Sequence, residues 1–233
     1  MFHLNQFKKM RSLLTILGLM YLSFGYSQST RDTVFLKKEK FETLYLTHDT
    51  SIHDYKWLVP ADLNVRNLSI YMDYFTGLLK DTVIKIKHFD FGNLPLKWSP
   101  IYMIKTKYYL YSPSDWMFSF GFVINDSIVL RQYSDDPGAL IILDYMQKSN
   151  NEYFFKLRTL QGIEYLTIKI IDAKLGIAVW KFVGNDYWKY RLMVNSNNVK
   201  QFPMVKCNCG ENKCVTEYKF EELDYEDIIS NAH

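Results

Sequence analysis

The sequence predicts an all-β fold, a single antiparallel sandwich or barrel-like domain of about ten strands with little helix. Three observations support this prediction. Segments of about 5–10 residues alternate apolar with polar side chains, as half-buried strands do. Short turn sequences separate these segments, and helical periodicity is weak along the whole chain. The pattern does not decide between a sandwich and a barrel, because both bury one face of each strand.

Four segments show the alternation most clearly, at residues 82–90, 102–110, 116–124 and 164–172. In the third of these, one face carries Trp116, Phe118, Phe120, Phe122 and Ile124. In the fourth, one face carries Leu166, Ile168 and Ile170. Residues 139–145 are almost continuously apolar instead, which predicts a central strand that is buried on both faces.

Three turns fix the expected strand registers, at residues 125–127, around Lys174, and at residues 184–186. The pairs that they predict are Ile124 with Ile128, Phe122 with Leu130, Ile168 with Trp180, Trp180 with Tyr190, and Phe182 with Trp188. Because a slip of one residue moves every side chain to the other face of the sheet, each pair is a strict prediction.

Residues 1–27 have the three parts of a secretory signal peptide. Lys8, Lys9 and Arg11 form a cationic start, and residues 13–24 form an apolar run that is too short to span a bilayer. Small residues at the −3 and −1 positions predict cleavage before Gln28. We therefore expect a periplasmic or extracellular protein, a single domain over residues 28–233 and no transmembrane segment after cleavage. The alternative is an uncleaved membrane anchor.

The charge of the chain is a formal +3, from 28 Lys and Arg against 25 Asp and Glu. The three basic residues of the signal peptide account for this surplus, so residues 28–233 balance to zero. A neutral chain without a basic tract does not favour nucleic acid as a partner.

The three cysteines, Cys207, Cys209 and Cys214, lie within residues 207–214. In an oxidising compartment this spacing predicts one disulfide in a tight loop, Cys209 with Cys214 or alternatively Cys207 with Cys214. A bond between Cys207 and Cys209 would be strained. A thiolate metal site and a redox pair are the alternatives for this loop, but we expect no metal. After the loop, residues 221–231 predict a short acidic C-terminal helix or tail.

The histidines supply candidates for a catalytic site. Two His-Asp dipeptides contain His48 and His53, but positions five apart face opposite ways on a strand, so only a loop could bring them together. His88 and Asp90 lie at the end of the strand expected at residues 82–90, and they form a second candidate pair. The common motifs of serine hydrolases, zinc proteases and nucleotide-binding proteins are absent from the sequence, and no cofactor is expected.

The aromatic residues, which include 18 Tyr, 16 Phe and 5 Trp, supply candidates for binding. Rings at a strand end can stack on sugars, and Tyr109, Tyr111 and Trp116 are the candidates for such a platform. The competing interpretation is that these rings pack in the core or at its rim.

The function that this sequence favours is an exported, non-catalytic all-β module that binds a ligand or interacts with the cell envelope. Its partner would be an envelope glycan or protein, and the sequence does not identify it. The alternative is a hydrolase whose His/Asp or paired-carboxylate site is assembled from separate strands. A third class, an outer-membrane barrel, fits the length, but residues 139–145 lack the alternation that such a barrel requires.

Overall fold

Strands dominate the structure, a computed structural model that describes residues 34–38, 42–61, 77, 85–113, 120–133, 138–184, 189–209, 218, 220 and 222–231. These residues belong to a compact unit that spans Thr33–His233. The three helices described are short: α2 (Asp54–Leu58), the 3-10 helix η3 (Ser196–Gln201) and α4 (Tyr225–Ser230). The prediction of an all-β fold with little helix is confirmed. The predicted signal peptide lies outside the described residues.

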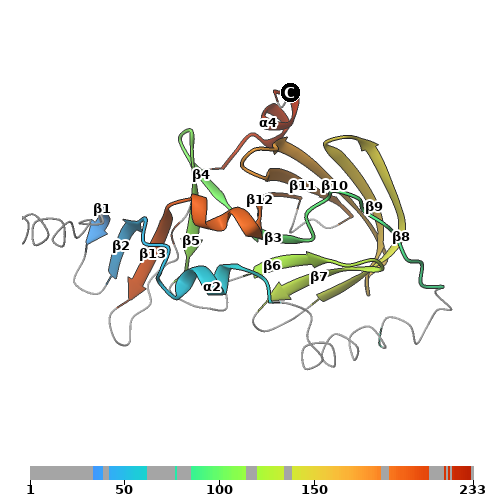
Figure 1. The fold of residues 1–233 in the computed structure, drawn as a ribbon, viewed down its shortest axis with the longest axis horizontal. Helices are drawn as coiled ribbons and strands as arrows, with labels where there is room; N and C mark the ends of the chain where they lie inside the picture. The colour runs from blue at the N-terminus through green and yellow to red at the C-terminus, as the bar shows by residue number, and fades with distance from the viewer. Residues whose placement is uncertain are drawn as a thin grey trace, which may run out of the picture. The chain divides into compact units, whose positions relative to one another are not determined.

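Eight antiparallel strands form a closed barrel in the order β10-β11-β12-β3-β6-β7-β8-β9 (Figure 1). Their bounds are β3 Lys97–Pro100, β6 Phe120–Ile124, β7 Ile128–Tyr133, β8 Gly138–Ser149, β9 Glu152–Arg158, β10 Ile163–Asp172, β11 Ile177–Val183 and β12 Tyr190–Asn195. Each strand is hydrogen-bonded on both sides, so this sheet has no edge to protect.

Five further strands form a second sheet in the order β1-β2-β13-β5-β4. Their bounds are β1 Val34–Lys38, β2 Glu42–Thr47, β4 Tyr102–Ile104, β5 Lys107–Ser112 and β13 Met204–Cys209. The contact between β13 and β5 is parallel, and the other three are antiparallel. The structure therefore combines a barrel with a sheet, where the sequence left sandwich and barrel open.

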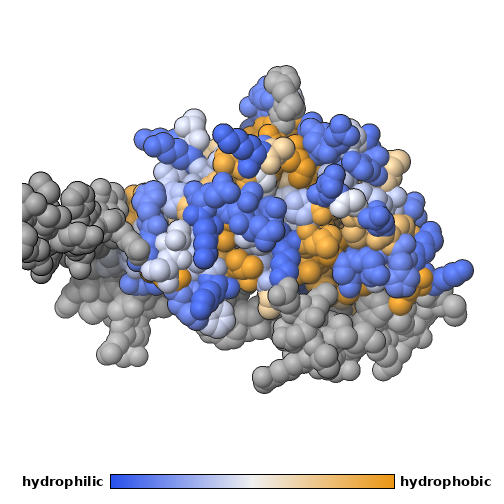
Figure 2. All heavy atoms as spheres, viewed as in Figure 1, coloured by the Kyte–Doolittle hydropathy of each residue, from blue (hydrophilic) through white to orange (hydrophobic). Residues whose placement is uncertain are grey.

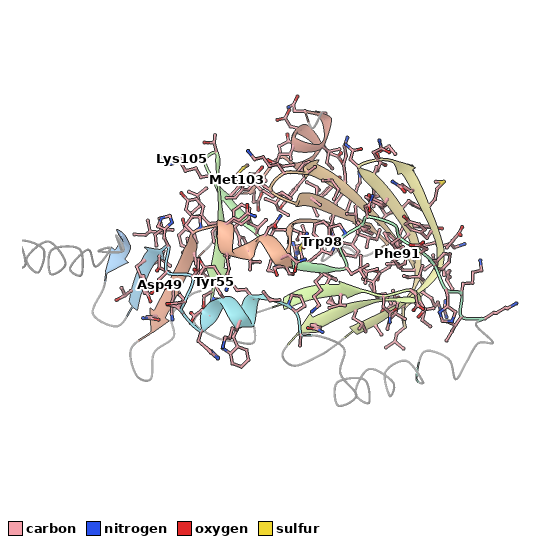
Figure 3. The ribbon with its side chains drawn as sticks, viewed as in Figure 1. Asp49, Tyr55, Phe91, Trp98, Met103 and Lys105 are labelled. Atoms are coloured by element: carbon pink, nitrogen blue, oxygen red, sulfur yellow. The ribbon has the colours of Figure 1, made fainter. Side chains whose placement is uncertain are left out.

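The barrel interior is filled with apolar and aromatic side chains. Trp98, Phe122, Phe155 and Trp180 have no exposed surface, and they belong to one continuous cluster that strands from all around the barrel supply. Figure 3 shows Phe91 and Trp98 within this part of the fold. Interior side chains of an eight-stranded barrel can fill its whole cross-section, and here they supply the main core.

A second apolar cluster covers the outer face of β11 and β12. Ile177 and Val179 face it from β11, while Leu110 of β5 and Met204 of β13 reach it from the second sheet. Helix α2 contributes Tyr55 to the same cluster. Strand β11 is therefore buried on both faces.

On the face shown in Figure 2, hydrophilic residues cover most of the described surface, with apolar residues between them.

The register predicted for the β6–β7 hairpin is wrong by one residue. The observed partners are Val123 with Leu130 and Ile124 with Val129. The reason is that Asn125 closes the turn: its side-chain Oδ1 accepts hydrogen bonds from the backbone N–H groups of Ser127 (3.0 Å) and Ile128 (2.9 Å). The loop is thereby one residue shorter than expected.

Strand β11 belongs to two hairpins, and the predicted register is right for one of them and wrong for the other. The predicted register between β10 and β11, with Ile168 opposite Trp180, is confirmed. Between β11 and β12 the prediction is wrong by one residue, because Trp180 lies opposite Arg191. The N–H of Phe182 donates to the carbonyl of Lys189 (2.9 Å), so Phe182 is paired with the residue that follows its predicted partner. Trp188, the expected partner of Phe182, lies outside the described residues.

Two of the expected strands differ from the structure. Residues 102–110 were expected to be one strand, but they are split into β4 and β5 by a tight turn in which Lys105 has a φ of 57°. The strand expected at residues 82–90 is wrong for residues 85–90, which form an irregular segment instead. Thirteen strands are described, more than the ten or so expected, and the split of residues 102–110 is one source of the difference.

Two other expectations are confirmed, the first of them in part. Of residues 139–145, inside β8, residues 139–142 are buried on both faces, whereas Asp144 is exposed. The acidic segment at residues 221–231 contains helix α4, and the Asp224 carboxylate caps it by accepting from the N–H of Asp227 (3.0 Å). Helix α4 packs against the second apolar cluster through Tyr225 and Ile229, and Lys181 of β11 forms a surface ion pair with its Glu226 (2.9 Å).

Candidate functional site

The candidate site is built on the turn and the short helix α2 that follow β2. The turn is held by side chains: Thr47 Oγ1 accepts from the N–H of Asp49 (3.1 Å), and Asp49 Oδ1 accepts from the N–H of Ser51 (2.9 Å) and from its hydroxyl (2.6 Å). These polar residues satisfy the backbone where the strand ends. Helix α2 begins after this turn, at Asp54, and its N-cap residue His53 makes no side-chain capping hydrogen bond.

The inner side of α2 is anchored to the rest of the fold. Tyr55 and Leu58 are buried, and the Tyr55 hydroxyl donates to the carbonyl of Phe202 (2.9 Å). The carbonyl of Leu58 accepts from the hydroxyl of Ser99 (2.6 Å), at a point where the helix ends. Burial, with a smaller contribution from the charge of Asp49, raises the pKa of Tyr55 to about 12. Tyr55 therefore remains a neutral donor at physiological pH.

Asp54 ties the start of α2 to the second sheet. Its Oδ2 atom lies 2.7 Å from Lys206 Nζ and accepts a hydrogen bond from the Ser112 hydroxyl (2.7 Å). Lys206 and Ser112 are register partners on β13 and β5. Burial acts to raise the pKa of Asp54, but the hydrogen bonds from Lys206 and Ser112 outweigh it, so the pKa lies below its ordinary value of 3.8. Asp54 is a charged anchor and a poor base at neutral pH.

The outer side of α2 carries Trp57, whose surface is 67% exposed. Its indole Nε1–H donates to Nδ1 of His53 (2.7 Å), one turn earlier, and the two rings meet edge to face with centroids 5.5 Å apart. Because Nδ1 accepts, the neutral imidazole carries its proton on Nε2. Trp57 is thus an exposed ring that is held in one orientation by a side-chain hydrogen bond.

The two His-Asp dipeptides do not form a shared catalytic centre. His48 is exposed in the turn and His53 contacts Trp57, while Asp49 caps the turn and Asp54 contacts Lys206. His53, Asp49 and Asp54 thus contact different partners, and they do not converge on one point. The arrangement provides an aromatic face with polar groups beside it, which is suited to binding.

His88 and Asp90, the second candidate pair, are not paired with each other. His88 Nδ1 lies 2.7 Å from Asp126 Oδ2 in the β6–β7 turn, and Asp90 Oδ1 accepts from the N–H of Gly92 (2.9 Å). The hydrogen bond from His88 lowers the pKa of Asp126. The Ser127 hydroxyl donates to Asp126 (3.0 Å), whereas an activated serine must donate to the histidine. The His88 and Asp126 side chains are 71% and 55% exposed, which is typical of a weak surface ion pair.

The ring candidates on β5 lie in a packed cluster. Tyr111 is 8% exposed, and its hydroxyl accepts from the N–H of Tyr218 (3.0 Å). Tyr102 and Phe220 stack on each other beside it, with centroids 4.2 Å apart, and Tyr109 packs against the same cluster. Trp116 lies outside the described residues. Tyr111 is therefore a covered ring and gives no open surface for a ligand.

The cysteine loop is described only at its start. Cys207 is buried on β13, in the cluster that also holds Tyr111 and Val205. The side chain of Cys209 and the whole of Cys214 lie outside the described residues, so both disulfide pairings stay predictions. Among the residues that the structure describes, no group of three or more His, Cys, Asp and Glu side chains is arranged to hold a metal ion.

Trp57 is not among the candidates that the sequence predicted, although a signal for it exists. Tyr55 and Leu58 are three residues apart, on the buried side of one helical turn, and Trp57 falls off that stripe. His53 lies four residues before it, at the spacing that brings side chains together on a helix. Within the described part of the chain, no helix is long and apolar enough to span a membrane.

Comparisons with known proteins add no assignment. No protein family, no curated protein and no solved structure matches this chain. The function of the chain is therefore inferred from the geometry of the site.

Proposed function

We propose that this protein is an exported, non-catalytic binding module of the cell envelope, and that it binds a glycan through Trp57. In this proposal residues 1–27 are removed before Gln28, and residues 28–233 work as one module. The cationic start, the short apolar run and the small residues before Gln28 support export.

The observation that carries the proposal is the exposed and oriented ring of Trp57. A free tryptophan on a surface samples several rotamers, and a ligand that stacks on it must select one of them. The hydrogen bond from Trp57 to His53 makes that selection before binding. The face of an indole ring is electronegative, so it attracts the slightly positive C–H groups on the face of a sugar ring.

The surroundings of Trp57 favour a glycan over a protein partner. Ser51, His53 and Lys56 are all exposed beside it in the sequence of the turn and helix. The centre of a protein interface is a contiguous apolar patch depleted of charge, whereas this ring is bordered by hydrogen-bonding groups. Polar groups around one aromatic face match the hydroxyl-rich edge of a sugar.

The alternative of a hydrolase receives no support from the same surface. Asp54 is bound to Lys206 and keeps a lowered pKa, which makes it a weak general base. His53 accepts a hydrogen bond from Trp57, so its Nδ1 is engaged with an indole. We therefore assign His53 a positioning role for the Trp57 ring.

The test is binding of the purified protein to a panel of soluble polysaccharides and peptidoglycan fragments, with immobilised polysaccharide as a second format. We expect Trp57→Ala to weaken binding by at least about tenfold, while the free energy of unfolding changes by less than about 0.5 kcal/mol because the ring is exposed. Tyr165→Ala, which removes another exposed ring, is the matched control and should bind as the wild type. His53→Ala should weaken binding by about two- to tenfold, because the ring becomes free to rotate.

Two outcomes would contradict the proposal. One is a wild-type protein that binds no glycan in the panel, and the other is a Trp57→Ala variant that binds as well as the wild type. Binding to envelope material that survives periodate oxidation of its sugars would indicate a protein partner instead. Export is tested separately by the intact mass of the exported chain, which should begin at Gln28.

A further inference from the structure

Exposed apolar side chains gather on the outer face of the barrel, around the turn that joins β9 to β10. Leu160 lies in that turn, and Ile163 and Tyr165 lie at the start of β10. Val183 ends β11, the next strand of the barrel (Figure 1). These four side chains are between 38% and 52% exposed. Because Leu166 points into the barrel, its neighbour Tyr165 points outward. We call the four residues the apolar tip.

The residues of the apolar tip are neighbours in space. Tyr165 lies directly opposite Val183, and residues opposite each other in an antiparallel pair share a face of the sheet. Ile163 is two residues before Tyr165 on the same strand, so it projects from the same face. The chain that follows Val183 packs against β10, since a Cβ atom on Gly184 would lie 3.0 Å from the carbonyl oxygen of Ile163. The turn of Leu160 and the end of β11 are therefore side by side.

Two sets of contacts hold this surface in a fixed shape. Thr159 closes the turn: its Oγ1 accepts from the N–H groups of Gln161 and Gly162 (both 3.1 Å), and its own N–H donates to the carbonyl of Gly162 (2.8 Å). The ring of Tyr165 stacks on Phe154 of β9, with centroids 5.7 Å apart. A surface that is already ordered loses little conformational entropy when a partner covers it.

Basic side chains border the apolar tip. Arg158 and Lys156 lie on the outer face of β9, each directly opposite a residue of the tip on β10. Lys189, which precedes β12, is exposed at the same end of the barrel. Among the described residues, the acidic groups on this side are Asp144, opposite Lys156 on β8, and Glu226, which is ion-paired with a lysine of β11. The surface around the tip is therefore positive, and it attracts an anionic partner.

The order of these side chains along the strands matches the layers of a membrane surface. Leu160 is in the turn and Ile163 comes next, while Tyr165 and its register partner Lys156 lie two residues, or about 7 Å, further along the strands. Apolar groups at a membrane interface are buried to a depth of about 5–10 Å. Tyrosine rings and long basic side chains stay at the level of the headgroups. The tip thus has aliphatic groups outermost and amphipathic groups behind them.

A second copy of the chain, or another protein, fits this surface less well. Four side chains that are about half exposed offer on the order of 300 Å², whereas each partner in a stable dimer buries roughly 800 Å². The centre of a protein interface is also depleted of charge, but here basic residues lie directly opposite residues of the tip. A bilayer needs only a small apolar insertion, to which anionic headgroups add attraction.

We propose that the apolar tip docks this protein on the surface of a bilayer that contains anionic lipids. The side chains of Leu160 and Ile163 enter the boundary between headgroups and acyl chains, and the ring of Tyr165 lies among the headgroups. Lys156 and Arg158 contact the lipid phosphates. The protein is held at the surface and does not cross the bilayer. This surface uses no residue of α2, so the inference does not depend on the proposed glycan site.

The experiment measures flotation of the full protein with lipid vesicles. One set contains phosphatidylcholine and phosphatidylglycerol in equal parts, and the neutral set contains phosphatidylcholine alone. We expect binding to the anionic vesicles to be at least about fivefold tighter, because each basic residue near an anionic surface contributes about that factor. Added salt should weaken this binding, since the attraction between charges is screened.

Substitutions in the apolar tip should weaken binding to the anionic vesicles. Leu160→Ser and Ile163→Ser should each weaken it by at least about fivefold, because less apolar surface leaves water. The matched control is Leu96→Ser. Leu96 is 48% exposed, and its carbonyl accepts from the N–H of Ile124 beside the β6–β7 turn, at the opposite end of the barrel. This variant should bind within about twofold of the wild type.

Substitutions of the basic residues test the charge separately. Lys156→Gln and Arg158→Gln should each weaken binding to the anionic vesicles by about three- to fivefold and leave binding to the neutral vesicles unchanged. Lys174→Gln is the matched control, because Lys174 is an exposed lysine in the turn between β10 and β11. It should bind within about twofold of the wild type.

A measurement on the wild type makes the test independent of how the variants fold. In NMR spectra of the protein with lipid nanodiscs that contain a paramagnetic lipid, the amide signals of Leu160 and Gly162 should broaden more than the signal of Leu96. This pattern reports directly which turn approaches the lipid.

Four results would overturn the proposal. Wild-type protein that does not float with the anionic vesicles contradicts it, as does equal binding to the neutral vesicles. A Leu160→Ser variant that binds as the wild type would place the contact elsewhere. Binding to native envelope vesicles without binding to pure lipid would show a protein partner at this surface. Trp57→Ala should float as the wild type, so a failure of this proposal is distinguishable from a failure of the glycan proposal.

Discussion

The barrel interior and the anchoring of α2 are two regions that hold the molecule together by different means. In the interior, apolar side chains such as Phe155 and Trp180 are buried at every second position, and each contacts several neighbours. At α2, where Tyr55 and Leu58 are also buried, single polar contacts add to the attachment, from Tyr55 to Phe202, from Ser99 to Leu58 and from Asp54 to Lys206. The first region is stabilised by buried area, and the second combines a smaller buried area with individual hydrogen bonds and charges.

This difference has a physical consequence for mutations. Removal of an interior ring loses both the transfer free energy and the packing contacts of many atoms. Loss of one polar contact at α2 costs only the difference between a protein partner and water, unless the group left behind is buried. The loss of unfolding free energy on substitution should therefore decrease from the barrel interior to α2.

The largest effect is expected for Phe155→Ala. Phe155 is fully buried in the barrel, so the variant should lose about 3–5 kcal/mol of unfolding free energy. The neighbouring Phe154→Ala is the control: Phe154 lies on the outer face and stacks on Tyr165, with centroids 5.7 Å apart, and should cost about 1 kcal/mol or less. Urea denaturation measures both. Similar losses for the two variants would contradict the assigned interior face of β9.

An intermediate effect is expected for Ser99→Ala. Its hydroxyl is fully buried and contacts the carbonyl of Leu58 (2.6 Å) and the hydroxyl of Ser196 (2.8 Å). Loss of this group leaves buried partners unsatisfied and should cost about 1–3 kcal/mol. Ser149→Ala, at an exposed turn, should change stability by less than about 0.5 kcal/mol. A neutral Ser99→Ala variant would mean that the hydroxyl does not anchor α2.

The smallest effect, and one that depends on pH, is expected for Asp54→Asn. Because solvent screens this half-buried ion pair, the loss at pH 7 should be about 1 kcal/mol. The folded-state pKa of Asp54 is lowered, so its contribution is present above the ordinary value of 3.8 and is lost as the pH falls through the folded-state pKa. Denaturation at pH 7 and near pH 3 should show the wild type and the variant converging at low pH. A constant difference would exclude the ion pair as the cause, and Asp144→Asn serves as the exposed control.

The same contrast explains what the sequence could predict. The interior faces of β9, β10 and β11 follow from alternation, since each strand has one face toward the barrel. The register of β10 with β11 was predictable as well, because residues on both sides of Lys174 alternate in phase. Burial on two faces was predictable for residues 139–142, where no polar residue interrupts the strand.

Registers that depend on one side chain or one backbone angle were not predictable in this way. Asn125 accepts two backbone hydrogen bonds and shortens its loop, while Lys105 turns the chain with a positive φ that normally favours glycine. Neither residue disturbs the apolar alternation around it. The errors at β6–β7 and within residues 102–110 therefore share one cause, which is that the pattern reports faces but does not report turn geometry.

Contacts across the fold were beyond prediction for a different reason. Asp54 meets Lys206 and His88 meets Asp126 only because the topology brings distant segments together. The sequence shows which side chains can carry a charge or form a hydrogen bond, but it does not show which distant residue each of them contacts. Trp57 was the exception, since its partner His53 lies one helical turn away.

Strand β11 separates the two apolar clusters, and this position links their stability. Trp180 and Ala178 project into the barrel, while Val179 and Ile177 project into the cluster under α2 and the second sheet. If the packing on one face of β11 is lost, the strand can shift, and the side chains on its other face then lose their contacts as well. The barrel and the attached sheet should therefore melt together in a single cooperative transition, with no stable half-molecule between the folded and unfolded chains.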